Sequence, residues 1–259
     1  MKHTERINKL RKYSVFVALI CLLGICWEFG AKDSDLRIFI STPTIAFEYF
    51  LNNYNDLFQA ATVTLIEALV GLVIATLFSF IVIIICLYVP KLMDFILPLM
   101  ITSQIIPLIT LAPLIALIFD IGLTAKIVMA ALLCFFPIFV NFANGINLIP
   151  KSITELMDVY NISKTKRIIH FYFPLSLPSI MSGLKVSATF AVIGAIMAEF
   201  CGSKIGLGKN LFLASKRLNP ELMINSLILS AILGGIFYIT INIIESKIGK
   251  WYKQTNIEK

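Results

Sequence analysis

The chain has 259 residues, of which 58% are hydrophobic and 14% charged, with a formal net charge of +7 and a mean hydropathy of +0.89. Soluble domains are about half apolar and about a quarter charged, so this composition excludes an ordinary water-soluble protein. The surplus of apolar residues predicts an integral membrane protein. In such a protein the basic residues lie mainly in the loops and termini, where they set the orientation in the membrane, so we expect no nucleic-acid partner.

Apolar stretches long enough to span a bilayer recur along the chain. A spanning helix needs roughly 20 mostly apolar residues to cross about 30 Å of hydrocarbon. The first stretch is the shortest and resembles a signal peptide, but no small-residue cleavage site follows Trp27 and Glu28, so we interpret it as a retained anchor. The sequence predicts an all-α membrane fold with six spans, at 13–29, 60–89, 95–119, 125–146, 177–200 and 222–244.

Basic residues predict the orientation of these spans, because cytoplasmic loops of membrane proteins carry an excess of Lys and Arg. With six spans both termini lie on one side, together with the basic clusters at 2–12, 151–167 and 247–259. We therefore predict cytoplasmic termini. The opposite loops carry fewer basic residues: Lys32, Arg37, Lys126, Lys204, Lys209, Lys216 and Arg217.

This topology divides the chain into three parts. Residues 1–12 form a cytoplasmic N-terminus, 13–252 form a single transmembrane domain, and 253–259 form a polar tail that we expect to fray. Between the first two spans, the polar and aromatic segment 30–59 is predicted to be a short cap that contains a helix, since it has too little apolar mass for a domain.

The loop at 149–178 is far longer than most other loops between spans. Ser152 and Glu155 have the spacing of a capping box, which predicts a helix from Ile153 to about Tyr160. Asn161 tolerates the left-handed conformation that ends a helix. A turn is therefore expected directly after this first short helix.

A second helix is expected after that turn. Ser163 is placed to cap it, and it would run through Lys164 and its basic neighbours to about Phe173, where Pro174 and Pro178 stop it before the chain re-enters the membrane. The residues alone fit equally well an amphipathic surface helix whose basic side chains lie at lipid headgroups.

The loop resembles the signature of the binding-protein-dependent ABC permeases, which has Glu-Ala-Ala, three residues, Gly, and a basic and apolar stretch ending in Leu-Pro. Glu155 matches the acid, Leu156 and Met157 stand at the alanines, and Asn161 stands at the glycine. Segments elsewhere are similar to the nitrate, sulfonate, taurine and thiamine-precursor branch: 198–203 with 206–208, 103–107 with 111–113, Phe136 and Pro137 with Asn141, and 41–43.

The resemblance implies a type I ABC importer permease: a non-enzymatic transport subunit that works as a homodimer in the bacterial cell membrane and moves a small solute. A solute-binding protein outside and two cytoplasmic ATPases are the implied partners. ATP and Mg²⁺ would bind the ATPase, because this chain lacks a GxxxxGK[ST] loop and is expected to hold no cofactor or metal. The implied ATPase-coupling residues are Ser152, Glu155, Leu156, Met157, Asp158, Asn161, Lys164, Pro174 and Pro178.

Polar residues at bilayer depth are costly and are therefore candidates for a solute pathway. Glu67 and Glu199 fall toward the outer side, where solvated interface positions explain them equally well. Prolines at 98, 107 and 113 predict kinks in the third span. The candidate pathway residues are Gln104, Pro107, Thr110, Asn141, Asn144 and Glu199.

Small residues within the spans have a simpler interpretation. The five cysteines, Cys21, Cys26, Cys86, Cys134 and Cys201, form no CxxC pair and are predicted to pack as small apolar side chains. Close helix packing is the role predicted for five glycines, namely Gly71, Gly183, Gly194, Gly234 and Gly235.

Two other functional classes remain as alternatives. A secondary transporter driven by an ion gradient often has repeated halves and ionisable groups near the midplane, but we find no halves and predict no buried carboxylate pair. A membrane-embedded enzyme would need converging His, Asp or Ser groups, whereas the polar residues here are scattered. The substrate stays open: basic residues in the outer loops suit a sulfonate or nitrate, and aromatic residues suit a thiamine precursor or flavin.

Overall fold

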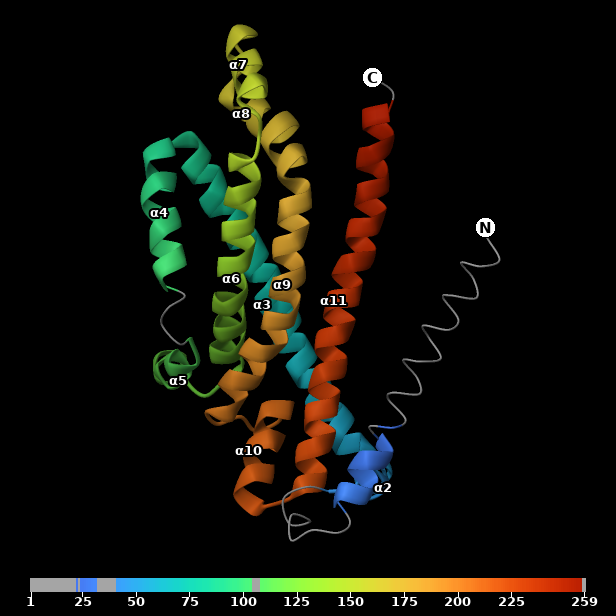
Figure 1. Cartoon of the computed structure of the whole chain (residues 1–259). Helices are drawn as coiled ribbons and strands as arrows, with labels where there is room; N and C mark the ends of the chain where they lie inside the picture. Colours follow the sequence, from blue (N-terminus) through green and yellow to red (C-terminus); the bar gives the residue numbers. More distant parts are fainter. Residues whose placement is uncertain (1–21, 23, 32–40, 104–107, 258–259) are drawn as a thin grey trace, which may run out of the picture. The chain divides into compact units, whose positions relative to one another are not determined.

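The computed structural model of the chain describes residues 22, 24–31, 41–103 and 108–257, and all regular structure in these ranges is helical (Figure 1). Four helices are long and apolar enough to cross a membrane: Tyr54–Tyr88, Leu123–Asn147, Lys164–Phe200 and Pro220–Gly249. They overlap the predicted spans at 60–89, 125–146, 177–200 and 222–244, which are thereby confirmed.

The predicted total of six spans is not confirmed. The stretch at 13–29 lies mostly outside the described residues. The described residues of the stretch at 95–119 lie in α4 (Pro90–Ser103), the 3₁₀ helix η2 (Leu108–Leu111) and α5 (Ala112–Phe119), and residues 104–107 lie outside the described ranges. Pro113 lies at the start of α5, where a missing backbone N–H costs nothing. Of the prolines that predict kinks, Pro98 lies inside α4, Pro113 follows the 3₁₀ helix η2, and Pro107 lies outside the described residues.

The described residues form two compact units. Unit 1 contains the residues up to Phe58 together with Asn210–Ile228, and unit 2 contains Gln59–Lys209 and the residues from Leu229 onward. Figure 1 shows all their helices.

Unit 1 contains the helix expected between the first two spans. Helix α2 (Pro43–Asn52) begins with a proline, and the Thr42 hydroxyl oxygen accepts a hydrogen bond from the Ile45 amide at 3.4 Å. The Asn225 side-chain amide donates to the α2 carbonyl of Ala46 at 2.8 Å. The predicted cap ends earlier than residue 59, because the long helix α3 (Tyr54–Tyr88) already begins one residue after Asn53.

Unit 2 packs α3, α6 (Leu123–Asn147) and α9 (Phe173–Phe200) through small residues. A Cβ added to Gly71 of α3 would lie 2.5 Å from Ala130 Cβ of α6, and one added to Gly194 of α9 would lie 2.7 Å from Ala130 Cα. Gly183 is equally tight against the Pro137 carbonyl of α6, at 2.8 Å. These contacts confirm the packing role predicted for three of the glycines, since a larger side chain would hold the helices apart.

The same prediction is wrong for Gly234 and Gly235 of α11 (Pro220–Ile257), because a Cβ at either position would meet nothing within 4 Å among the described atoms.

The packing role of the cysteines holds for Cys86 and Cys134, which are buried. Cys26 is exposed, Cys201 is partly buried with a thiol pKa raised by that burial, and Cys21 lies outside the described residues.

Candidate functional sites

The loop at 149–178 begins with α7 (Lys151–Val159), which stands with α8 (Lys164–Arg167) beyond the ends of α6 and α9 (Figure 1). The predicted capping box is wrong: Pro150 is the cap residue, and Ser152 and Glu155 both lie inside the helix. Pro150 has φ −57° and ψ 138°, a non-helical cap conformation, so the helix begins at Lys151, two residues earlier than a Ser152 cap would allow.

The end of α7 is as predicted. Asn161 has φ 50°, the left-handed conformation, its amide donates to the Asp158 carbonyl, and the Ile162 amide donates to the Met157 carbonyl, both at 3.0 Å. These paired bonds are the Schellman arrangement that satisfies the last carbonyls of a helix. The chain therefore turns sharply at Asn161, and α7 projects as a separate short helix.

Arg167 of α8 holds this turn in place. Its guanidinium donates to the Asp158 carboxylate at 2.5 Å, to the Ile162 carbonyl at 2.7 Å and to the Met157 carbonyl at 3.1 Å. The predicted site residues omitted Arg167, although a guanidinium nine residues after an acid, across a predicted turn, is a signal that sequence offers. Met157 and Asp158 are thus joined through a residue that the prediction missed.

The two faces of α7 differ sharply in exposure. Met157 is fully buried at 0% exposure, whereas Leu156 is 53% and Val159 is 83% exposed. Residues three or four apart share a helix face, so Leu156 and Val159 lie on one face with Ser152 and Glu155. The apolar side chains of Leu156 and Val159 are therefore exposed on the face of α7 opposite the buried Met157.

The predicted second helix does not stop at the prolines. Helix α8 continues through a π-helical turn, η3 (Ile168–Tyr172), into α9 without a break, and Pro174 and Pro178 both lie within α9. The Phe173 amide donates to the Ile168 carbonyl, five residues back, so the turn is wider than an α turn. This extra width directly before Pro174 relieves the clash that a proline ring makes in a regular helix.

Contacts with α3 and α6 tie the loop to the spans. The Lys164 ammonium donates to the Tyr88 carbonyl at the end of α3, at 3.4 Å, and the Tyr88 and Thr165 hydroxyls are 2.9 Å apart. The rings of Phe80, Phe142 and Phe173 cluster beneath these bonds, with centroids 5.1 to 6.3 Å apart. A displacement of α7 and α8 would therefore be transmitted to three spans at once.

A second site lies inside unit 2. Glu67 of α3 and Glu199 of α9 are both 0% exposed, and Lys126 of α6 is 8% exposed. The Lys126 ammonium donates to Glu67 Oε1 at 2.7 Å. The expectations of solvated positions for the two acids and of no buried carboxylate pair are therefore wrong, and Lys126 is not a free basic residue of a loop.

Glu199 binds the chain that follows α9. Its Oε1 accepts from the Thr64 hydroxyl at 2.7 Å, its Oε2 accepts from the Gly208 amide at 2.5 Å, and the Thr64 oxygen accepts from the Leu207 amide at 3.0 Å. Gly208 and Leu207 begin α10 (Leu207–Arg217), whose free N-terminal amides favour an anion. The Glu199 carboxylate supplies that anion from a neighbouring helix.

Two glycines make this approach possible. A Cβ on Gly206, which has φ +147°, would lie 2.2 Å from the Glu199 carboxyl, and a Cβ on Gly208 would lie 2.3 Å from the Ile196 carbonyl. Neither position has room for a side chain, and the φ at Gly206 suits glycine alone. The spaced glycines that carried the family resemblance are thus required by the closure of the loop over Glu199.

The predicted pathway residues lie on separate elements. Thr110 of η2 and Asn144 of α6 are exposed, and the Asn141 amide donates to the Pro137 carbonyl of its own helix at 2.8 Å. Glu199 is buried in the cluster described above. Gln104 and Pro107 lie outside the described residues.

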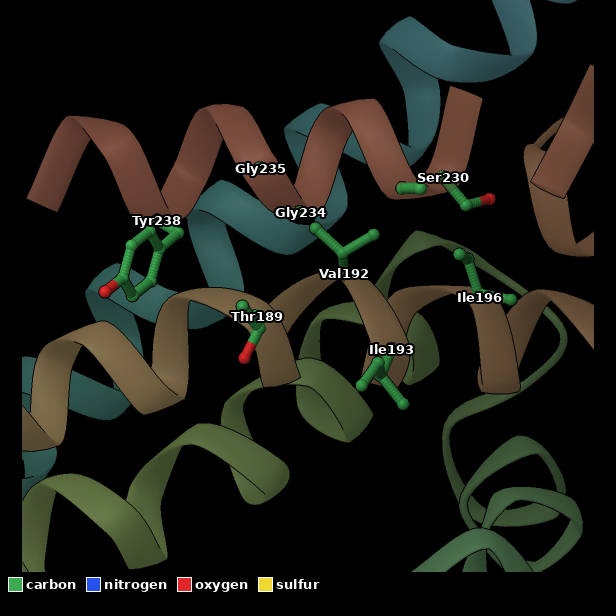
Figure 2. Close-up of a pocket in the computed structure, with 9 residues that line it drawn as sticks. Thr189, Val192, Ile193, Ile196, Ser230, Gly234, Gly235 and Tyr238 are labelled. Carbon is green, nitrogen blue, oxygen red and sulfur yellow. The ribbon is translucent and has the colours of Figure 1, made fainter. Parts of the chain in front are cut away.

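An open cavity of about 470 Å³ lies between α9 and α11 (Figure 2). Its α9 wall contains Val192 and Ile196, and its α11 wall contains Gly234 and Gly235, where an added Cβ would meet no described atom within 4 Å. The groove is almost entirely apolar. Its remaining lining residues are Thr189, Ile193, Ser230, Ala231 and Tyr238.

Together these features define a multi-pass helical membrane protein with an ordered loop that presents an apolar surface. Residues 87–253 match the family described as binding-protein-dependent transport system inner membrane component. Because that match covers more than half of the chain, the protein belongs to this family of ABC transporter permeases. The resemblance seen in the sequence is thereby confirmed.

Individual proteins similar to this chain are also named as transport permeases. The chain is 32% identical over 225 residues to a probable ABC transporter permease protein of Haemophilus influenzae, covering 86% of this chain and 92% of the relative. It is 28% identical over 195 residues to the formylaminopyrimidine transport permease protein ThiX of Halalkalibacterium halodurans, covering 72% and 75%. It is 31% identical over 146 residues to the putative aliphatic sulfonates transport permease protein SsuC of Escherichia coli, covering 56% of each chain.

Proposed function

We propose that this permease forms the membrane pathway of an ATP-driven importer of a small solute, and that α7 docks onto a cytoplasmic ABC ATPase. The observation that carries the proposal is the exposed apolar face of α7, with Val159 83% and Leu156 53% exposed on a helix that Arg167 holds in place. Apolar side chains gathered on a projecting helix outside the spans mark a protein contact.

The positions of the loop's anchors support coupling between such an ATPase and the spans. Force on α7 reaches Met157 and Asp158, passes through Arg167 to α8, and continues into α9 without a break in the helix. The same motion reaches α3 through Tyr88. An ATPase that closes around α7 would therefore move α3 and α9 together, and α6 with them through the cluster of Phe80, Phe142 and Phe173.

The proposed topology has six spans with cytoplasmic termini. We assign 13–29 to the first span and the segment that contains α4, η2 and α5 to the third. With α7 in the cytoplasm, the basic clusters at 151–167 and 247–259 lie inside, as the positive-inside rule requires. The burial of Lys126 removes one basic residue from the opposite side, which strengthens the asymmetry.

The proposed assembly is a homodimer served by a solute-binding protein on the outer side. In the span Pro220–Gly249 only 11% of the most apolar window is buried within the chain, against 50% in Lys164–Phe200. The first of these helices thus leaves most of its apolar surface to lipid or to a second copy. For the solute we propose the chemistry named for the relatives, an aliphatic sulfonate or a formylaminopyrimidine.

One observation favours the alternative of an ion-gradient transporter, namely the buried pair Glu67 and Glu199. Coupling by an ion, however, requires a site that opens to water during transport. Glu199 is held by Thr64 and by the start of α10, and each of the three charged residues is buried, with Lys126 the most exposed at 8%. The structure of this pair therefore favours a locked element over a carrier site.

Copurification tests the proposal. The tagged chain is purified from its native host in mild detergent, as the parent, as Val159→Glu and as Lys166→Glu, and its partners are identified by mass spectrometry. Val159 is so exposed that a carboxylate there leaves the fold intact while charging the apolar face, and Lys166 is exposed on α8, away from that face. We expect an ABC ATPase with the parent and with Lys166→Glu, and a loss of at least tenfold with Val159→Glu.

Two results would contradict this. If Val159→Glu retains the ATPase at the parental level, α7 is not the docking element. If the parent brings down no ATPase at all, the chain does not work in an ATP-driven importer.

A further inference from the structure

The buried charges of this protein are concentrated at one place. Among the described residues, the charged side chains that are buried are Glu67, Lys126 and Glu199, one each from α3, α6 and α9. Charged groups at bilayer depth are expensive and persist only when they are paired or have a function. Three such groups in one cluster therefore require compensating charges and hydrogen-bond partners for their buried atoms.

One carboxylate oxygen of this cluster, Glu67 Oε2, has no hydrogen-bond donor among the described residues. Glu67 Oε1 accepts from the Lys126 ammonium, Glu199 Oε1 accepts from the Thr64 hydroxyl, and Glu199 Oε2 accepts from the Gly208 amide. Glu67 Oε2 is buried, and no donor among the described residues reaches it. Thr64 and Glu67 lie one turn apart on the same face of α3, which places the Glu67 carboxyl against that of Glu199, with which it interacts.

The charges do not balance either. Two ionised carboxylates and one ammonium leave a net negative charge enclosed among helices, and no other buried cationic side chain among the described residues compensates it. The basic residues that follow Glu199 in the sequence, Lys204 and Lys209, are not buried, and the Lys209 ammonium donates to the Lys204 carbonyl instead. A single proton between the two carboxyls would correct both deficits.

We propose that Glu67 and Glu199 bind one proton between them, forming an electroneutral site with Lys126 that locks the start of α10 against α3. The proton gives Glu67 Oε2 a partner and leaves the Glu199 oxygens free to accept from Thr64 and Gly208. A monovalent metal ion would also balance the charge, but Gly206 packs so tightly on the Glu199 carboxyl that a Cβ there would lie at 2.2 Å. This site does not depend on the proposed ATPase contact.

The site makes the lock sensitive to pH in one direction. The proton is bound in the folded chain, so its contribution to stability is complete at low pH and is lost as the pH rises past the point where the proton leaves. The two carboxylates then repel one another across the contact that holds α10. Raising the pH therefore releases the loop at 202–208 before it affects the rest of unit 2.

Infrared spectroscopy tests the proposal directly, because a protonated carboxyl has a C=O band separate from that of a carboxylate and shifts in D₂O. The purified chain in lipid nanodiscs is measured at neutral pH as the parent, Glu67→Gln, Glu199→Gln, Lys126→Met and Glu48→Gln. Glu48 is exposed on α2 and serves as the matched control. We expect one such band in the parent and in Glu48→Gln, none in Glu67→Gln or Glu199→Gln, and a doubled band in Lys126→Met.

Absence of the band in the parent would overturn the proposal, and stabilisation of the parent by sodium ions would then assign the site to a metal ion. The Glu67→Gln variant keeps the bonds of Glu199 to Thr64 and Gly208, so it stays informative if Glu199→Gln does not fold. Thermal unfolding against pH is the second measurement. The parent is expected to lose stability at high pH and Glu67→Gln to lose much less, and equal slopes would also overturn the shared proton.

Discussion

The carboxylate of Glu199 accepts a hydrogen bond from the backbone amide of Gly208, nine residues further along the chain, at 2.5 Å. This bond holds the beginning of α10 against the end of α9. It explains why the intervening segment contains glycines at fixed places, since Gly206 and Gly208 leave no room for a side chain next to Glu199.

Gly206→Ala is expected to destabilise the protein by about 2 kcal/mol or more, because it combines a strained positive φ with a steric clash against the Glu199 carboxyl. Gly235→Ala is the matched control, since a Cβ there meets open space and alanine favours a helix. The midpoint of thermal unfolding in detergent measures both. A Gly206→Ala variant as stable as the parent would show that the loop does not close on Glu199.

Arg167→Ala is expected to loosen the turn between α7 and α8. The bond to Asp158 is worth at most about 1 kcal/mol, because that carboxylate is 67% exposed, so the two bonds to backbone carbonyls matter more. Asp158→Asn should therefore have a smaller effect than Arg167→Ala. The rate of chymotrypsin cleavage after the exposed Tyr160 measures the loosening.

For that experiment Lys166→Ala is the control, because Lys166 is an exposed neighbour on the same helix. We expect cleavage to be several-fold faster in Arg167→Ala and unchanged in Lys166→Ala. Equal cleavage rates in the two variants would mean that Arg167 does not hold the turn.

Sequence alone predicted the parts of the fold that depend on local composition. The spans at 60–89 and 125–146 are long apolar runs, and Asn161 ends α7 because few other residues tolerate its φ of 50°. The continuous helix from α8 into α9 was missed because a proline is expected to stop a helix. A π turn just before Pro174 overrides that local rule, and hydrogen bonds of this kind leave no mark in the residue pattern.

The buried cluster was missed for a different reason. Glu67, Lys126 and Glu199 are each isolated in the sequence, and only the packing of three helices brings them together. Each appeared to be a polar residue near a span end, where water explains it. The structure places α3 from Tyr54, so Glu67 lies more than a dozen residues inside a continuous helix, whereas the span predicted from residue 60 put it near the start.

Lys126→Met is expected to destabilise the protein by about 3 kcal/mol at neutral pH, because it leaves Glu67 buried without its cation. The double variant Glu67→Leu with Lys126→Met removes both charges and should recover most of that loss. A double-mutant cycle on thermal or chemical unfolding gives the coupling between the two residues. Additive effects of the two single substitutions would contradict a direct ion pair.

Ala130→Leu is expected to prevent the close packing of unit 2. Ala130 is fully buried, and Gly71 from α3 and Gly194 from α9 both approach it so closely that neither has room for a Cβ. Three added carbons at this crossing must push two helices away from α6, and overpacking of this kind costs about 1 to 3 kcal/mol or more. Ala231→Leu adds the same volume in the open groove between α9 and α11, so it is the control. Unfolding midpoints of the purified variants measure the difference, and an Ala130→Leu protein as stable as Ala231→Leu would show that the three helices do not meet at Ala130.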